Sequence, residues 1–281
     1  MDANAKKRLS VIANRIRQHI IVGTFHAKSG HPGGSLSIAD TLAYLYFEEM
    51  NVRPEDPKWA GRDRFVLSKG HAAPALYGVL AVKGFFSEEL IPSLRKIGSI
   101  LQGHPDMKNI PGVDMSAGSL GQGVSTAVGM ALGAKLSGDD FRTYTILGDG
   151  EIEEGQVWEA AMFAAHKKLD NLVVIVDNNN LQIDGTVEEV NSPYPIPEKF
   201  EAFGFHVIEI DAHDFDAIDA AFKEAKTVKG KPTAIIQTSV KGKGVSFMEN
   251  QVSWHGSAPN EEQKDLALAE LTAARKALEE A

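Results

Sequence analysis

The feature that most constrains the fold of this chain is a series of short, almost wholly apolar segments that alternate with helix-like stretches. Segments rich in β-branched and aromatic residues have the length of strands and span residues 64–67, 144–147, 172–176, 206–210 and 233–237. Strands that are apolar on both faces are typical of parallel sheets covered by helices on both sides. Their alternation with helices therefore predicts a doubly wound α/β fold with a mostly parallel sheet.

The helical stretches are predicted from the spacing of apolar residues. Leu9, Ile12, Ile16 and Ile20 recur at steps of three and four residues, which predicts a first helix that ends before Gly23. Further helices are expected at residues 38–49, 72–82, 121–136, 152–168 and 215–228.

The last stretch, residues 260–281, is rich in alanine, glutamate and leucine. Asn260 and Gln263 have the spacing of a reciprocal N-cap, so we expect a helix from this point to the C-terminus. The chain shows no internal repeat, no low-complexity linker and no convincing domain boundary. We therefore expect one domain over residues 1–281, with a C-terminal helical extension that packs on the domain or faces a partner.

Composition excludes several classes of protein. The 281 residues carry 29 Lys and Arg against 38 Asp and Glu, a formal charge of −9, which argues against a charge-driven grip on nucleic acid or an anionic membrane. Cysteine is absent, so disulfides, thiolate nucleophiles, iron–sulfur clusters and cysteine-ligated zinc are excluded. No apolar run approaches the ~20 residues of a membrane-spanning helix. We expect a soluble, cytoplasmic protein.

Polar loops follow two consecutive strands. Gly148, Asp149 and Gly150 follow the segment 144–147, and Asn179 lies in the loop after 172–176. One crossover helix separates the two loops, which places the strands side by side and lets both loops open onto one edge of the sheet, where α/β proteins bind ligands. Carboxylate and amide oxygens suit Mg²⁺, and the glycines allow a phosphate to approach the backbone. The pattern predicts a magnesium–diphosphate site.

Two simpler interpretations compete with this one. Either loop alone is a common turn or strand end, and only the combination at this spacing is specific. A dinucleotide-binding module is disfavoured, because residues 118–123 (GSLGQG) lack the Gly-x-Gly-x-x-Gly order and follow no apolar strand.

The stretch 121–136 that comes next contains many small residues, including Gly123, Gly129 and Gly133, which predicts close packing against its neighbours.

The two polar loops, 148–155 (GDGEIEEG) and 178–185 (NNNLQIDG), resemble the signature of thiamine diphosphate enzymes and, more closely, of transketolases. The resemblance continues in order over nearly the whole chain. Its further motifs are 28–33 (KSGHPG), 62–71 (RDRFVLSKGH), 103–105 (GHP), 118–123 (GSLGQG) and 255–259 (HGSAP). It implies the thiamine diphosphate-binding fold of the family's first, diphosphate-binding domain.

The resemblance implies roles for individual residues. Asp149, Asn179 and the backbone carbonyl of Leu181 would hold Mg²⁺, for which Ca²⁺ or Mn²⁺ can substitute. Glu154 and Glu159 match positions through which transketolase sites communicate across a subunit interface. The residues that would contact thiamine diphosphate are His71, Gly118, Leu120, Gly121, Gly150, Asn179 and His255.

Four of the nine histidines adjoin a glycine in a predicted loop: His31, His71, His104 and His255. A neighbouring glycine lets the backbone turn tightly and leaves the imidazole open to a ligand. We expect all four to lie near strand ends of one sheet. The resemblance implies that His31, His104 and His255 are catalytic, and that His31 and His104 contact the sugar together with Arg95.

The resemblance stops before the second domain of full-length transketolases, which binds the pyrimidine ring and supplies an activating glutamate. We therefore expect the chain to be silent alone and to act as the N-terminal subunit of a split transketolase. Its partner would be a C-terminal, pyrimidine-binding subunit, most simply in a heterotetramer. Together they would transfer a two-carbon ketol unit from a ketose to an aldose.

Other interpretations remain open at this point. One is the α subunit of a 2-oxoacid dehydrogenase or a deoxyxylulose phosphate synthase, although the motifs at 29–33 and 255–259 favour transketolase. Another is a non-catalytic binding or regulatory subunit of the same fold. The sugar is not determined: pentose and hexose phosphates, as in the pentose phosphate pathway, are the default, but split transketolases also serve specialised catabolic routes.

Overall fold

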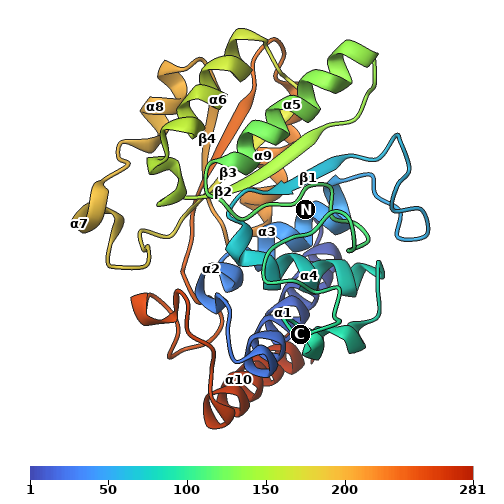
Figure 1. Ribbon diagram of the computed structural model, residues 1–281, viewed down its shortest axis with the longest axis vertical. Helices are drawn as coiled ribbons and strands as arrows, with labels where there is room; N and C mark the ends of the chain where they lie inside the picture. The colour runs from blue at the N-terminus through green and yellow to red at the C-terminus, as the bar shows by residue number, and fades with distance from the viewer. Residues whose placement is uncertain (281) are drawn as a thin grey trace.

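The computed structural model describes residues 1–280, and these residues form a five-stranded parallel sheet (Figure 1). The strand order is β1-β2-β3-β5-β4, and neighbouring strands are parallel throughout. The predicted strands are all confirmed, with small extensions at their ends. Their bounds are β1 (Arg64–Leu67), β2 (Thr143–Gly148), β3 (Leu172–Asn178), β4 (His206–Asp211) and β5 (Thr233–Thr238).

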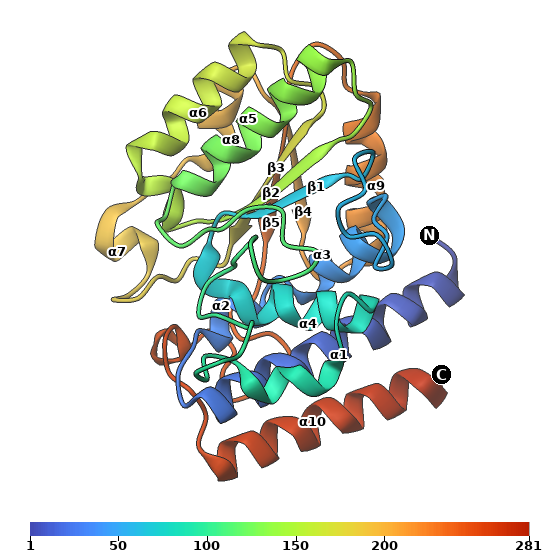
Figure 2. The ribbon, with the colours of Figure 1, turned by 45° about the vertical axis from the view of Figure 1, so that its right-hand side comes forward.

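Helices cover both faces of the sheet, so the doubly wound α/β fold is confirmed (Figure 2). In β3, Val173 and Ile175 point into one core, whereas Val174 and Val176 point into the other. The second core lies under α5, α6 and α8, and the first lies under the remaining long helices. The α-helices are α1 (Ala3–Ala27), α2 (Pro32–Leu36), α3 (Ala39–Tyr44), α4 (Ala73–Lys83), α5 (Gln122–Ser137), α6 (Gly155–His166), α7 (Val187–Asn191), α8 (Ile196–Ala202), α9 (Phe215–Thr227) and α10 (Glu261–Glu280).

The helix predictions differ from the structure at a few places. The first helix passes through Gly23, contrary to expectation, and ends before Lys28, which has a left-handed backbone (φ 51°). Gly23 is buried against Leu94 and Ile91, so it serves close packing and does not end the helix. The stretch 38–49 divides into α3 and a π-helical turn. Sequence analysis missed α2, α7 and α8, which are too short to show a clear periodicity.

The C-terminal helix α10 begins with the predicted reciprocal cap. Asn260 Oδ1 accepts a hydrogen bond from Gln263 N, and Gln263 Oε1 accepts one from Asn260 N, both at 2.9 Å. The helix lies antiparallel along α1 (Figure 2), and Leu271 is buried between them. No helix of residues 1–280 is long and apolar enough to cross a membrane.

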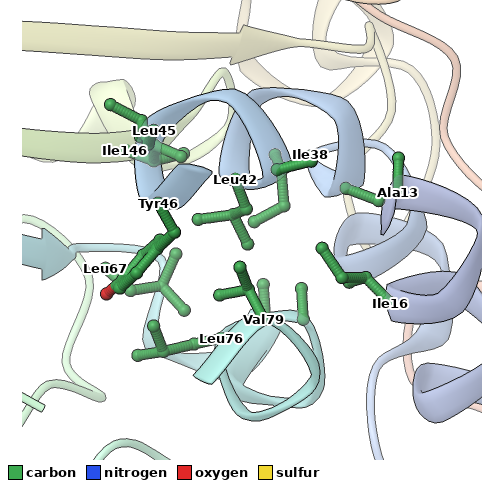
Figure 3. Close-up of a cluster of buried hydrophobic side chains, with 14 of the residues drawn as sticks. Ala13, Ile16, Ile38, Leu42, Leu45, Tyr46, Leu67, Leu76, Val79 and Ile146 are labelled. Atoms are coloured by element: carbon green, nitrogen blue, oxygen red, sulfur yellow. The ribbon is translucent and has the colours of Figure 1, made fainter. Parts of the chain in front are cut away.

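A second layer of helices makes the first core deep (Figure 3). Ile16 of α1, Leu42 of α3 and Val79 of α4 pack together and against Leu67 and Ile146 of the sheet. Because α4 starts directly after the loop that leaves β1, this packing also fixes the position of that loop. The rigid core thus holds the loops on which the polar residues lie.

Of the three glycines inside helix α5, only Gly123 packs closely against a neighbouring segment. A Cβ atom on Gly123 would lie 2.6 Å from Ser68 Cα, at the end of β1. Gly129 and Gly133 face open space, because a Cβ atom at either position would have no neighbour within 4 Å. The expectation of close packing along the whole stretch is therefore wrong, although Ala127 and Ala131 are buried.

We predict opposite effects for two glycine-to-alanine changes in α5. Gly123→Ala overpacks a backbone contact and should lower the free energy of unfolding by about 1–3 kcal/mol. Gly129→Ala meets no neighbour and should raise it by roughly 0.5–1 kcal/mol, because alanine loses less backbone entropy in a helix. Urea unfolding of the purified variants measures both. Equal effects of the two changes would contradict this account of the helix.

Candidate functional site

A cavity of about 440 Å³ lies at the carboxyl edge of the sheet. The loops after β1, β2, β3 and β5 all contribute to its wall. The sequence-predicted residues that line it are His31, His71, His104, Gly118, Leu120, Asp149, Gly150, Asn179, Leu181 and His255. The fold therefore gathers into one space residues that are spread over more than two hundred positions of the chain.

The two polar loops are joined directly by hydrogen bonds. Strands β2 and β3 pair in register, with Gly148 opposite Asp177, so the predicted side-by-side placement of these strands is confirmed. Asp149 Oδ2 accepts a hydrogen bond from Asn180 N, and Asp149 Oδ1 accepts one from Gly150 N. Asn179 donates from Nδ2 to Asp177 and accepts at Oδ1 from Leu181 N.

The Asp149 carboxylate is buried without an ion-pair partner among residues 1–280. Burial, together with the negative charge of Asp177, raises the pKa of Asp149 to about 7. A buried carboxylate of this kind is stabilised by a cation, and the nearby Asn179 side chain and Leu181 carbonyl add neutral oxygen atoms. The donor set fits Mg²⁺. No cluster of three His, Asp or Glu side chains suited to a metal occurs in the described chain. A metal here would therefore be held by Asp149 together with these neutral ligands.

Sequence reasoning missed Lys241, which lies in the loop after β5. Its Nζ donates to the Leu181 carbonyl and lies 2.9 Å from His255 Nδ1. Burial lowers the pKa of Lys241 to about 8, against the opposing effect of the Asp149 charge. The lining of the cavity therefore includes two buried carboxylates that have no ion-pair partner among residues 1–280, Asp149 and Glu151, together with the buried amines of Lys69 and Lys241. A lysine between small residues in a loop after a strand gave too weak a signal to be singled out.

A buried ion pair at the wall of the cavity, between Lys69 and Asp177, was also missed. Lys69 Nζ lies 2.6 Å from Asp177 Oδ2, and the hydroxyls of Ser37 and Ser239 donate to the same carboxylate. Burial favours the neutral acid, but the Lys69 charge and these hydrogen bonds outweigh it and hold the pKa of Asp177 below its usual range. Lys69 lies within the recognised motif 62–71 and Asp177 directly precedes the motif 178–185, which was the available signal.

Gly121 does not line the cavity, unlike its neighbours Gly118 and Leu120. Its N–H donates to Glu151 Oε1, which also accepts from the Ser68 hydroxyl. The buried Glu151 thereby ties the start of α5 to the loop after β2. Gly121 consequently supports the wall of the cavity from behind.

The four predicted histidines all line the cavity, although of the four only His71 directly follows a strand. The rings of His31, His71 and His255 lie 5.1–5.5 Å from one another, and His104 packs beside Gly118. All four therefore lie near strand ends of one sheet, as expected, although His31 comes from the short connection between α1 and α2.

These imidazoles are uncharged at neutral pH. Burial, followed by nearby positive charges, lowers the pKa of His31 to about 4 and that of His255 to about 3. The same causes lower the pKa of His71 strongly and that of His104 to a lesser extent. A neutral imidazole has one donor and one acceptor nitrogen, so this cluster can bind hydroxyl groups in both directions.

Arg95 and the two proposed interface glutamates lie outside the lining of the cavity. Arg95 has a left-handed backbone, and its guanidinium donates to Ser29 Oγ at 2.9 Å. The same guanidinium donates to the Gly103 carbonyl at 3.4 Å, which places it against the segments that carry His31 and His104. Glu154 and Glu159 are exposed at the start of α6.

The family of this chain follows from comparison with known proteins. The family model for the transketolase thiamine diphosphate binding domain matches residues 9–275, and the chain belongs to this family. It is 48% identical to the 6-deoxy-6-sulfo-D-fructose transketolase subunit SqwG of Clostridium sp. (strain MSTE9), over 92% of this chain and 94% of that one. It is 43% identical to a subunit of the apulose-4-phosphate transketolase of Phocaeicola vulgatus, over 94% of both chains.

Solved transketolases share the fold but are longer. The Campylobacter jejuni transketolase superposes with a TM-score of 0.88 at 32% identity, over 99% of this chain but 46% of that one. Human transketolase is 44% identical over 91% of this chain and 40% of its own length. The chain thus spans less than half the length of these enzymes and nearly all of the two subunits.

We predict that the buried neutral histidines make folding pH-dependent. The unfolded chain takes up protons at about pH 6.5, whereas His71 stays neutral in the fold, so the free energy of unfolding should fall as pH decreases from 7 to 5. His71→Asn should reduce this slope, by at most about 1.4 kcal/mol per pH unit. Chemical unfolding across that pH range provides the measurement.

The matched control for this prediction is His166→Asn, because His166 is exposed at the end of α6. Its loss should leave the pH profile of stability unchanged. A His71→Asn profile that parallels the wild-type profile would show that the imidazole is not buried as described.

Proposed function

We propose that the chain is the N-terminal, cofactor-binding subunit of a two-subunit transketolase. The observation that carries this proposal is the single cavity that combines Asp149 and Asn179 with four neutral histidines. The family match and the two subunit-length relatives support it. The reaction is the transfer of a two-carbon ketol unit from a ketose or its phosphate to an aldose or its phosphate.

The cofactors of this proposal are thiamine diphosphate and Mg²⁺. Asp149, Asn179 and the Leu181 carbonyl would hold the metal, and Gly118 and Gly150 let a diphosphate approach the backbone. Thiamine diphosphate supplies the carbon nucleophile and the electron sink when it is bound. The protein supplies position and charge.

The histidines give the cavity its proton chemistry. His31, His104 and His255 all line the cavity. Because they are neutral, each can accept a proton from a sugar hydroxyl and, once protonated, return it to a developing alkoxide. Arg95, which contacts Ser29 and Gly103, supplies the positive charge expected for a phosphate or another anionic group on the sugar.

The partner in this proposal is a separate C-terminal subunit that binds the pyrimidine ring of the cofactor. The relatives that match over 94% of their own length are named as subunits, which supports a separate chain. We propose that the two chains form a heterotetramer and that the exposed Glu154 and Glu159 lie at a subunit interface. We place this enzyme in the cytoplasm. The sugar is proposed only as a class, since the two relatives are named for different substrates.

We predict that the chain gains ketol transferase activity only with its partner, thiamine diphosphate and Mg²⁺. Asp149→Asn should reduce that activity at least ~100-fold, because a charged oxygen ligand is lost from the metal. Steady-state kinetics of the reconstituted enzyme, with a candidate partner encoded nearby, measures this.

Asp140→Asn is the matched control, because Asp140 is exposed just before the opposite end of β2. Its activity should equal that of the wild type. Full activity of Asp149→Asn, or ketol transfer without added thiamine diphosphate and Mg²⁺, would refute the proposed site.

A further inference from the structure

The segment 240–243, which carries Lys241 into the cavity, is held from outside the cavity at both of its ends. At one end Val240 N donates to His213 Nε2 at 3.0 Å. At the other end Arg17 Nε donates to the Lys243 carbonyl at 3.0 Å. His213 and Arg17 do not line the cavity, so they act on this segment only through its backbone.

Asp40 joins the two ends of this arrangement. Its Oδ2 accepts from His213 Nδ1 at 2.7 Å, and its two carboxylate oxygens accept from the two terminal nitrogens of Arg17. The three side chains come from α3, from α1 and from the loop between β4 and α9. The backbone of the segment is therefore fixed by parts of the fold that are remote from one another in sequence.

The hydrogen bonds determine the tautomer of His213. Val240 N–H can only donate, so His213 Nε2 must accept and carries no hydrogen. The ring hydrogen is then on Nδ1, where it donates to Asp40. Asp40 is ionised, since the Arg17 charge and the bonds from His213 and Arg17 outweigh its burial and lower its pKa to about 2.

The middle of the segment is equally constrained. Gly242 has a left-handed backbone (φ 81°), and its N–H donates to the Gly33 carbonyl at 3.0 Å. A Cβ atom at this position would lie 2.3 Å from the Met248 carbonyl oxygen. Lys241 itself is only 1% exposed, so its ammonium group keeps its place in the cavity only if this backbone does not shift.

We propose that Asp40 and His213 are positioning residues that hold segment 240–243 so that the Lys241 ammonium group projects into the cavity. The importance of Lys241 for catalysis rests on the proposed function, but its placement does not. A second His–carboxylate pair, His206 with Glu224, lies at the opposite end of β4 and contacts no loop of the cavity.

The test compares His213→Ala, His213→Gln and His206→Ala in the free chain. His213→Gln keeps an oxygen acceptor near the position of Nε2, whereas His213→Ala removes it. The readout is the rate at which acetic anhydride acetylates individual lysines, followed by peptide mass spectrometry. Lys69, which is 2% exposed and borders the same cavity, is the internal reference.

In His213→Ala, Lys241 should be acetylated about five- to tenfold faster relative to Lys69, the change expected when one hydrogen bond is lost from a local opening equilibrium. His213→Gln and His206→Ala should keep the wild-type ratio. A wild-type ratio in His213→Ala, or an equal rise at both lysines, overturns the proposal, because the latter shows general loosening.

A measurement on the wild-type chain keeps the proposal testable if His213→Ala does not fold. Nitrogen NMR of the imidazole rings at pH 7 should show His213 with hydrogen on Nδ1 and none on Nε2. The opposite tautomer, or a ring protonated on both nitrogens, overturns it. Both experiments use the free chain, so they are independent of ketol transfer and of the partner subunit.

Discussion

The buried ion pair between Lys69 and Asp177 is the interaction on which the site depends. Its carboxylate accepts hydrogen bonds from Ser37, Ser239 and Asn179, so segments from α2 and from the ends of β1, β3 and β5 meet at one group. Removing one partner of such a pair leaves a buried charge, which costs about 3–5 kcal/mol. The attraction between the two charges is largely offset by the cost of removing both from water, so the intact pair adds little to overall stability. Its main effect is to fix the geometry of the loops.

The Lys69–Asp177 pair also influences the charge of the cavity, because it lies next to the unpaired carboxylate of Asp149. Asp177 is neutralised by Lys69, but its negative charge still raises the pKa of the neighbouring Asp149, which has no ion-pair partner among residues 1–280. Burial keeps the histidines neutral and lowers the pKa of Lys241, whose ammonium group donates to the Leu181 carbonyl. A cation with an attached diphosphate would complement these charges, because a carboxylate attracts the cation and an amine attracts the phosphates.

The core explains why the loops can hold such groups. Buried polar clusters are stable only when nearly every donor and acceptor is satisfied, and this requires a backbone that does not move. Two layers of helices over one face of the sheet provide it, and α4 packs into that core directly after the His71 loop (Figure 3). On the other face of the sheet, Glu151 fixes the backbone by joining α5 to the loop after β2.

Local periodicity and one short crossover were enough to predict the strands, the long helices, the capped start of α10 and the pairing of the Asp149 and Asn179 loops. The folded chain was needed to show which glycines of α5 pack closely, that Gly121 supports the cavity without lining it, and that Lys69, Asp177 and Lys241 belong to the site. The physical reason is that their partners are distant in sequence: Lys69 and Asp177 are joined across the sheet, and Lys241 reaches Leu181 from another loop, so no local pattern records the contact.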